Sequence, residues 1–519
     1  MDILPLAATR YRMVVTARSL RRIAAQWQVA VIATGLALRP APPAPIIAGM
    51  STPYDLILRG GTAWGASGPI AGDIAVRGGR IVAMGEIAGD ATRVIDASGK
   101  LILPGGVDVH AHIEQRSGMG VMNADTFETA TRSAALGGTT SVISFAAQAK
   151  GQSLSEAVAE YQARARRGAA IDHAFHIMVT DPTVPGFADD LRALVEAGHR
   201  SVKVFTTYDI RLDDGEILDV MYILREVGAL LCIHAETHAI IASATRRLLA
   251  EGKTAPHHHA ASHPRMAEIE AVGRMIRFAE LTGQPIMLFH LSTPEAADAV
   301  RGARRRGIPV WAETCPHYLL MAEEVLHQDG AAKWMCSPPQ RSTADCAGLW
   351  EAIGRDDIQL ISSDHAPYRA DATGKFVNGT DVPFTKIANG MPGLETRLPL
   401  IFDAVVSRGR GTVADFVRLT AKAPARLYGL AGKGDLRPGC DADLVVWDPA
   451  RQVTYGDDDL HDNVGYNPWT GHTVTGWPET VILRGEVIAE DGAFHGQPGQ
   501  GNWIKRPADA GAWAKEATR

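Results

Sequence analysis

The pattern of apolar and polar positions between residues 105 and 426 alternates between two kinds of segment. Short apolar runs are each followed by a longer stretch with the spacing of a helix. Strands that alternate with helices in this way predict a parallel sheet. There are eight such runs, at residues 107–112, 139–145, 173–179, 201–208, 229–236, 285–292, 309–316 and 358–365. Eight units predict an α/β fold in which residues 104–431 form a (β/α)8 TIM-like barrel.

The chain on either side of the predicted barrel has a different pattern of apolar and polar residues. Residues 54–103 contain short alternating strands broken by glycines, which predict a small antiparallel sheet. A similar pattern returns at residues 432–490. We therefore expect the two flanks to pair into one small β-sandwich domain, followed by a C-terminal tail at residues 491–519.

The first 49 residues fit neither pattern. They hold a single acid, Asp2, against Arg10, Arg12, Arg18, Arg21, Arg22 and Arg39. An apolar stretch at residues 29–38 then leads into a proline-rich segment, a composition that a targeting peptide would share. We favour a simpler interpretation, an N-terminal extension upstream of a true start at Met50, and we expect it to be dispensable.

The overall composition narrows the class of protein. Apolar residues make up 46% of the chain and charged residues 21%, as in a globular enzyme. A net charge of -6 gives no support to nucleic-acid binding, and no uncharged apolar run reaches the length of about 18 residues that crosses a bilayer. The five cysteines show no CxxC spacing, so we expect neither a disulfide framework nor a zinc knuckle, and a cytoplasmic location.

Polar groups that can bind metals stand at the ends of the predicted strands, where barrels of this kind carry their chemistry. His110 and His112 are two positions apart on one strand, so both imidazoles point to the same face. Further candidates at the ends of later strands are His234, His290 and Asp364. Nitrogen donors combined with a carboxylate suit divalent zinc or manganese.

Lys203 is a lysine within an apolar strand, where an unpaired charge is costly. In one interpretation Lys203 pairs with Asp364 or another nearby acid. In the other, its neutral amine has reacted with carbon dioxide to give a carbamate, which can bridge two cations ~3.5–4 Å apart. The surrounding histidines favour the carbamate. A second group of histidines, His257 to His259 with His263, is interpreted as a solvated loop, because neighbouring positions cannot easily address one ion.

Seven motifs in order, GGVDVHAH, SVKVFTTY, LLCIHAET, LFHLST, ETCPHYLLM, MCSPPQR and SSDHAPY, resemble the amidohydrolase superfamily. More narrowly they are similar to dihydropyrimidinases and hydantoinases, and the similarity extends over residues 54–506. The resemblance implies hydrolysis of a cyclic amide or ureide to the N-carbamoyl amino acid. It also implies two divalent ions per subunit, zinc or else manganese, whose shared water is ionised to the attacking hydroxide.

The resemblance further assigns roles to individual residues. It implies one metal held by His110, His112 and Asp364, a second held by His234 and His290, and Lys203 as the bridging N6-carboxylysine. Asp364 is expected to act as general base and then general acid, and Tyr208 to donate a hydrogen bond to the oxyanion. The main chain at Ser292 and Asn389 is expected to bind the ring.

Two loops depart from the family pattern. After His112 the chain reads IEQRSGMGVMNAD, where hydantoinases usually have Leu-Asp-Met-Pro-Phe, and the loop after Tyr208 looks shorter. The ring substituent is therefore not predicted, and allantoin or a cyclic imide stays an alternative. A dihydroorotase needs a cation after HxH, whereas this chain has Ile113 and Glu114. A non-catalytic scaffold would have lost metal ligands. Relatives are commonly homotetramers, so we expect residues 495–506 to form an arm that contacts a neighbouring subunit.

Overall fold

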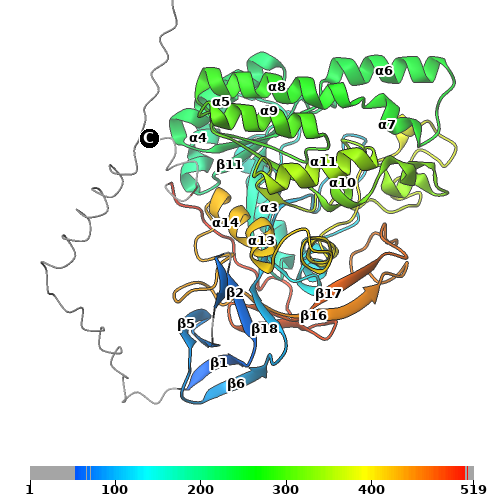
Figure 1. Cartoon of the computed structure of the whole chain (residues 1–519). Helices are drawn as coiled ribbons and strands as arrows, with labels where there is room; N and C mark the ends of the chain where they lie inside the picture. Colours follow the sequence, from blue (N-terminus) through cyan, green and yellow to red (C-terminus); the bar gives the residue numbers. More distant parts are fainter. Residues whose placement is uncertain (1–52, 66, 71, 509–510, 512–519) are drawn as a thin grey trace, which may run out of the picture. The chain divides into compact units, whose positions relative to one another are not determined.

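The computed structural model describes residues 53–65, 67–70, 72–508 and 511 (Figure 1). The predicted extension at residues 1–49 and the predicted start at Met50 lie outside the described residues. From Pro53 onward the chain forms one compact unit, so the boundary between a sandwich and a barrel domain stays a prediction. No helix within the described ranges is long and apolar enough to span a membrane.

Eight parallel strands form a barrel, and each strand pairs with the next one along the chain. They are β8 (Gly106–Ala111), β9 (Thr139–Ala147), β10 (Asp172–Met178), β11 (Ser201–Phe205), β12 (Leu230–His234), β13 (Ile286–Leu288), β14 (Val310–Thr314) and β15 (Leu360–Ile361). Each overlaps one of the eight predicted runs, so the predicted barrel is confirmed. The ring closes where Ala111 pairs with His365, a few residues after β15.

Helices connect the barrel strands and surround them (Figure 1). The α-helices are α2 (Phe127–Leu136), α3 (Leu154–Gly168), α4 (Phe187–Ala197), α5 (Asp214–Val227), α6 (His238–Ala250), α7 (His258–Ser262), α8 (Arg265–Thr282), α9 (Pro294–Arg305), α10 (Pro316–Leu320), α11 (Thr343–Gly354), α12 (Arg397–Phe402), α13 (Val413–Val417) and α14 (Ala423–Tyr428). Shorter helical turns are η1 (Glu323–His327), η2 (Ala331–Trp334), η3 (Phe384–Lys386), η4 (Asp403–Ser407) and η5 (Arg418–Lys422). Capping boxes start several of them: Ser153 with Glu156 begins α3, for example.

Two further sheets lie outside the barrel, and the second of them combines strands from both ends of the chain (Figure 1). The first has the order β5 (Arg80–Gly85), β4 (Asp73–Arg77), β1 (Tyr54–Arg59), β6 (Ala91–Asp96). The second has the order β19 (Ala493–Phe494), β18 (Glu486–Glu490), β17 (Thr473–Leu483), β16 (Leu444–Thr454), β7 (Leu101–Pro104), β2 (Thr62–Gly65), β3 (Gly68–Ile70). β7 pairs with β16, which confirms that the two flanks join. Both sheets bury apolar side chains in one core, which includes Leu56, Ile102 and Leu444.

The alternation in the N-terminal flank predicted a purely antiparallel sheet, and this prediction is wrong in part. β1 runs parallel to β6, and β2 runs parallel to β7. The reason is topological: β6 joins the edge of the sheet beyond β1 after a crossover, instead of following β5 in a hairpin. Alternation along one strand reports which side chains are buried, and it does not report the direction of the neighbouring strand.

A buried ion cluster connects the barrel to the C-terminal flank. The Lys433 ammonium lies 2.5 Å from a carboxylate oxygen of Asp172, at the start of β10. It also lies 2.7 Å from Asp443 and 3.0 Å from Asp441, both just before β16. The Lys433 side chain is only 2% exposed, so the three carboxylates replace the water that the ammonium would otherwise bind.

The tail that was predicted to reach a neighbouring subunit lies along its own barrel. The backbone N–H of His173 donates to Asn502, and that of Ile504 donates to His173. The buried Arg506 donates to the hydroxyl of Ser201 and to the carbonyl of Phe175. The inner face of this tail is therefore used within the chain, and its role in oligomerisation stays a prediction.

Candidate metal centre

The predicted metal-binding groups come together at one end of the barrel. His110 lies in β8, Lys203 in β11 and His234 at the end of β12, while His290 and Asp364 follow β13 and β15. The Nε2 atom of His110 lies 3.0 Å from Oδ1 of Asp364. The rings of His234 and His290 have centroids 4.5 Å apart, and those of His110 and His290 are 5.4 Å apart. One atom each of His110, His290 and Asp364 lies within 4.8 Å of the others, close enough to share an ion.

The backbone is strained at this site. His290, Asp364 and Tyr208 have φ angles of 42°, 48° and 69°, in the left-handed region that side chains other than glycine rarely adopt. Strained residues of this kind persist only where the surrounding structure holds them, and they gather at functional sites. All three residues are among the site residues predicted from the sequence.

Three of the four histidines have one ring nitrogen held by a neighbouring side chain. Nδ1 of His110 contacts Glu313, Nδ1 of His112 lies 2.7 Å from Gln115 Oε1, and Nε2 of His234 lies 2.9 Å from Glu236 Oε2. A partner of this kind fixes the tautomer and leaves the opposite nitrogen free as a ligand. Burial also lowers the pKa of His234, which favours the neutral ring that binds metals.

Lys203 is fully buried, and its amine makes no hydrogen bond to any described residue. It forms no ion pair with an acid in that part of the chain, so the interpretation of a Lys203–Asp364 pair is not supported by the structure. Three aromatic rings surround the amine, with the Phe289 centroid 4.0 Å away. Burial lowers the pKa of Lys203 to about 8. A lowered pKa increases the fraction of the amine that is neutral, and the neutral amine is the form that reacts with carbon dioxide.

The buried polar atoms fit a site for divalent ions. The Nδ1 atom of His290 makes no hydrogen bond to a described residue, like the amine of Lys203. A buried polar group without a partner is costly, and such groups are expected where an ion or ligand completes the site. The donor set of imidazoles and a carboxylate is chemically suited to zinc or manganese.

Tyr208 lies at the edge of this centre. Its ring centroid is 5.4 Å from that of His234. Burial raises the pKa of Tyr208, against hydrogen bonds from Ser337 and Asn389 that lower it. The phenol therefore keeps its proton at neutral pH and can donate a hydrogen bond.

The two predicted ring-binding residues, Ser292 and Asn389, differ in which backbone hydrogen-bonding groups are free to bind a ligand. The N–H of Ser292 donates to the carboxylate of Glu268 at 2.7 Å, and the hydroxyl of Ser292 donates to the same carboxylate. Only the carbonyl of Ser292 is left without a partner among the described residues. At Asn389 both the N–H and the carbonyl are without one, while its side-chain amide donates to Ser337.

The interpretation of His257 to His263 as a solvated loop is wrong for two of these residues. His259 and His263 are 2% and 5% exposed. Nδ1 of His263 lies 3.0 Å from Glu236, the carboxylate that also holds His234. Nε2 of His259 lies 2.8 Å from the carbonyl of Cys336. His263 thus shares Glu236 with His234, one of the predicted metal ligands. The sequence signal was the acid two positions after His234, which can reach the same histidine on the strand face.

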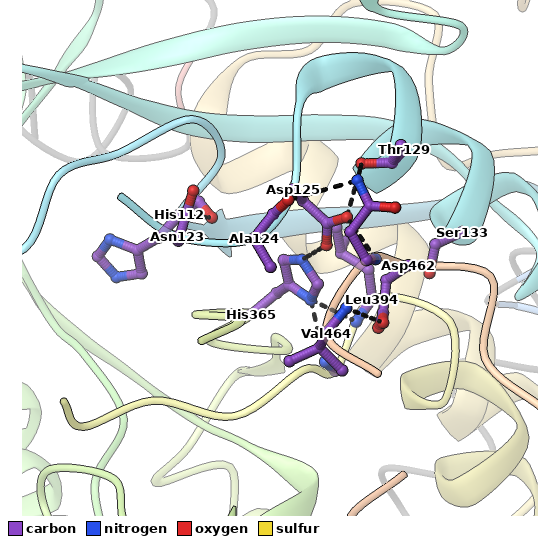
Figure 2. Close-up of polar contacts among 12 residues, drawn as sticks. His112, Asn123, Ala124, Asp125, Thr129, Ser133, His365, Leu394, Asp462 and Val464 are labelled. Atoms are coloured by element: carbon purple, nitrogen blue, oxygen red, sulfur yellow. Dashed lines mark hydrogen bonds and ion pairs between the residues drawn. The ribbon is translucent and has the colours of Figure 1, made fainter. Parts of the chain in front are cut away.

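A second buried group of titratable side chains surrounds His365, the residue after Asp364 (Figure 2). Nε2 of His365 lies 2.9 Å from Asp125, and its Nδ1 accepts hydrogen bonds from the N–H groups of Gly393 and Leu394. Asp462 lies close to this pair. Both nitrogens of His365 are therefore in use, so this group anchors the chain after Asp364 and offers no free imidazole to a metal.

Comparisons with known proteins agree with this geometry. Residues 101–488 match the profile of the Amidohydrolase family. A D-hydantoinase of Ralstonia pickettii is 38% identical over 457 residues, which cover 87% of this chain and 99% of that protein. A D-hydantoinase of Rhizobium radiobacter is 37% identical with the same coverage. The crystal structure of a dihydropyrimidinase from Brevibacillus agri has a TM-score of 0.84 at 36% identity, and it covers 87% of this chain and 98% of its own.

Proposed function

The chain belongs to the amidohydrolase family, and from this we propose that it is a metal-dependent cyclic amidohydrolase that opens a dihydropyrimidine or hydantoin ring to the N-carbamoyl amino acid. The observation that carries the proposal is the meeting of four histidines, Asp364 and an unpartnered buried lysine at one end of the barrel. The identity to hydantoinases over almost their whole length supports the same class of substrate.

We assign one metal position to His110, His112 and Asp364, and the other to His234 and His290. Lys203, as N6-carboxylysine, would bridge them, because burial lowers the pKa of its amine to about 8 and the amine makes no hydrogen bond or ion pair with a described residue. Two divalent cations, zinc in our proposal, would polarise the ring carbonyl and lower the pKa of the attacking water. The partners that hold Nδ1 of His110 and His112 orient these rings toward the shared Asp364.

Asp364 is the proton carrier in this proposal. Burial alone would raise its pKa, but the adjacent imidazole of His110 outweighs this effect and holds the pKa well below its ordinary value. The group is therefore a carboxylate at neutral pH and can accept the proton of the attacking water. It then delivers that proton to the ring nitrogen that leaves.

The main chain and Tyr208 would hold the ring. The free carbonyl of Ser292 can accept from a ring N–H, while Asn389 offers both a donor and an acceptor. A cyclic amide or ureide carries N–H and C=O groups side by side, so it matches this set. The phenol of Tyr208 can donate to the oxygen on which negative charge develops.

The loop after His112 supports a neutral ring. Ile113 is fully buried, and the guanidinium of Arg116 donates to the carbonyl of Gly120 in its own loop. No cation stands at the two positions after His112, Ile113 and Glu114, where a dihydroorotase would need one. The cysteines among the described residues are all free and buried, which supports our proposal of a cytoplasmic enzyme.

A turnover panel tests the proposal. Purified protein is incubated with dihydrouracil, hydantoins with small and aromatic substituents, allantoin, cyclic imides and dihydroorotate, with and without full metal removal. We expect ring opening of a dihydropyrimidine or hydantoin, about two divalent ions per chain, and loss of turnover on chelation. Activity that survives complete metal removal would refute the metal-dependent mechanism, and turnover confined to allantoin or imides would correct the substrate.

A further inference from the structure

Lys375 is a second fully buried lysine, and it lies outside the metal centre. Its ammonium donates to the carbonyl of Ala388 at 2.9 Å and to the carbonyl of Gly390 at 2.7 Å. These two carbonyls stand on either side of Asn389. One side chain therefore holds both neighbours of the residue to which we assign ring binding.

No carboxylate neutralises this ammonium. Within the described ranges Lys375 forms no ion pair, unlike the buried Lys433 with its three acids. Burial lowers the pKa of Lys375 to about 7. A fold that needed only to fill this space could do so with an apolar side chain at no electrostatic cost. Because burying the amine is costly, we infer that its hydrogen bonds to the backbone have a role beyond filling space.

The segment from Ala388 to Met391 is fixed by further backbone contacts. The N–H of Gly390 donates to Met335, and the carbonyl of Met391 accepts from Ala366, both at 2.8 Å. Gly390 has a φ angle of 144°, and a Cβ added there would lie 2.3 Å from the carbonyl of Ala366. The N–H and the carbonyl of Asn389 itself bind no described residue.

We propose that Lys375 is a positioning residue for substrate: by holding the carbonyls of Ala388 and Gly390, it turns the N–H and carbonyl of Asn389 toward the ring. The inference rests on the proposed function, because it takes the ring as the partner of Asn389. Lys375 does not contact the reacting atoms in this proposal. Its loss should weaken binding of the ring and leave the metal ions and the chemical step almost unchanged.

The test compares Lys375→Met with a matched control, Lys386→Met. Both substitutions remove one lysine charge from the same part of the chain, but Lys386 is exposed. The probe is hydantoin, for which KM and kcat are measured separately, together with metal content and Tm. Amide hydrogen exchange of the peptide that covers residues 387–391 provides a readout that does not depend on turnover.

We expect Lys375→Met to raise KM about tenfold or more, with kcat within about threefold and metal content unchanged. Exchange at residues 387–391 should become faster, while Lys386→Met matches the wild type in every readout. An unchanged KM, or a fall in kcat and metal content with KM constant, would overturn the inference. If the wild type opens no ring at all, the proposed function fails instead, and the exchange data alone decide whether Lys375 holds this segment.

A folding defect is handled by a second variant. Lys375→Gln keeps two N–H donors without the charge, so it should give a smaller rise in KM than Lys375→Met. If neither variant folds while Lys386→Met does, Lys375 serves the stability of the fold, and the positioning role is wrong.

Discussion

The imidazole of His263 lies 3.0 Å from Oε1 of Glu236, and Oε2 of the same carboxylate lies 2.9 Å from His234. A residue outside the barrel strands thus orients a proposed ligand through one shared acid. Burial would raise the pKa of Glu236, but His263 and His234 outweigh this effect and hold it well below its ordinary value. The acid is therefore charged when it supports His234.

Replacement of Glu236 by Gln should weaken metal binding. The amide is uncharged and can accept through only one of its two ends, so it cannot hold His234 and His263 as the carboxylate does. We expect metal affinity to fall about 10- to 100-fold, measured by competition with a chelator of known affinity. Glu226→Gln is the matched control, because Glu226 is exposed on α5 and pairs with Arg192 at the surface. Equal metal affinity in both variants would contradict the supporting role.

Replacement of Lys203 by Ala removes the proposed bridge. Less negative charge would then separate the two cations, so metal content and turnover should fall together. Acetate or propionate, added with metal, can occupy the vacated space, and we expect partial return of turnover. Lys253→Ala serves as the control, because Lys253 is exposed. A bare amine at Lys203 in the mass and electron density of metal-loaded protein would contradict the carbamate.

Replacement of Tyr208 by Phe keeps the ring and removes the hydroxyl. The proposed oxyanion donor is lost, so kcat should fall about 10²-fold or more, while metal content stays at the wild-type value. The measurement is kcat at saturating hydantoin, with metal analysis of the same sample. If kcat is unchanged, Tyr208 contributes packing beside His234 and no more.

Replacement of Lys433 by Met should destabilise the protein without affecting the metal centre. It leaves Asp443 buried without its ammonium, while Asp172 keeps Arg484. Loss of one partner of a buried pair costs about 3–5 kcal/mol. The readout is the urea midpoint. Lys100→Met is the contrast, because Lys100 pairs with Asp448 and Glu479 near the surface, where such a pair contributes about 0–1 kcal/mol. An equal fall of the urea midpoint in the two variants would contradict the claim that burial makes the Lys433 cluster more costly to break.

The sequence predicted the barrel because its evidence is local. Each strand is a short apolar run with its own flanking helix, and the proposed ligands other than Lys203 stand at or just after strand ends. The directions of β6 and β7 were missed, because they depend on crossovers that no alternation along one strand records. The ligand set was suggested by spacing and by resemblance, and the structure brings His110, His290 and Asp364 together.

The supporting residues were not predicted, because their partners are distant in sequence. Glu313 and His263 look like any acid and any histidine until β14 and α7 are placed beside the centre. Lys375 is a similar case: nothing in its local sequence shows that its ammonium ends between two carbonyls of another segment. Residues of this kind are recognised from three-dimensional contacts and not from spacing.

The seam between β8 and β15 suggests a mechanical role for the proposed metal centre. β15 has two residues. Among the described residues, one backbone bridge, between Ala111 and His365, closes the ring there, beside hydrogen bonds from Ser363 to Asp108 and His110. The first local opening of the barrel is therefore expected along this line. A cation shared by His110 and Asp364 would crosslink the first strand to the segment after the last one. Loss of metal should then increase hydrogen exchange at the seam before any other part of the barrel responds. The cation would therefore hold the two ends of the barrel together as well as serve catalysis.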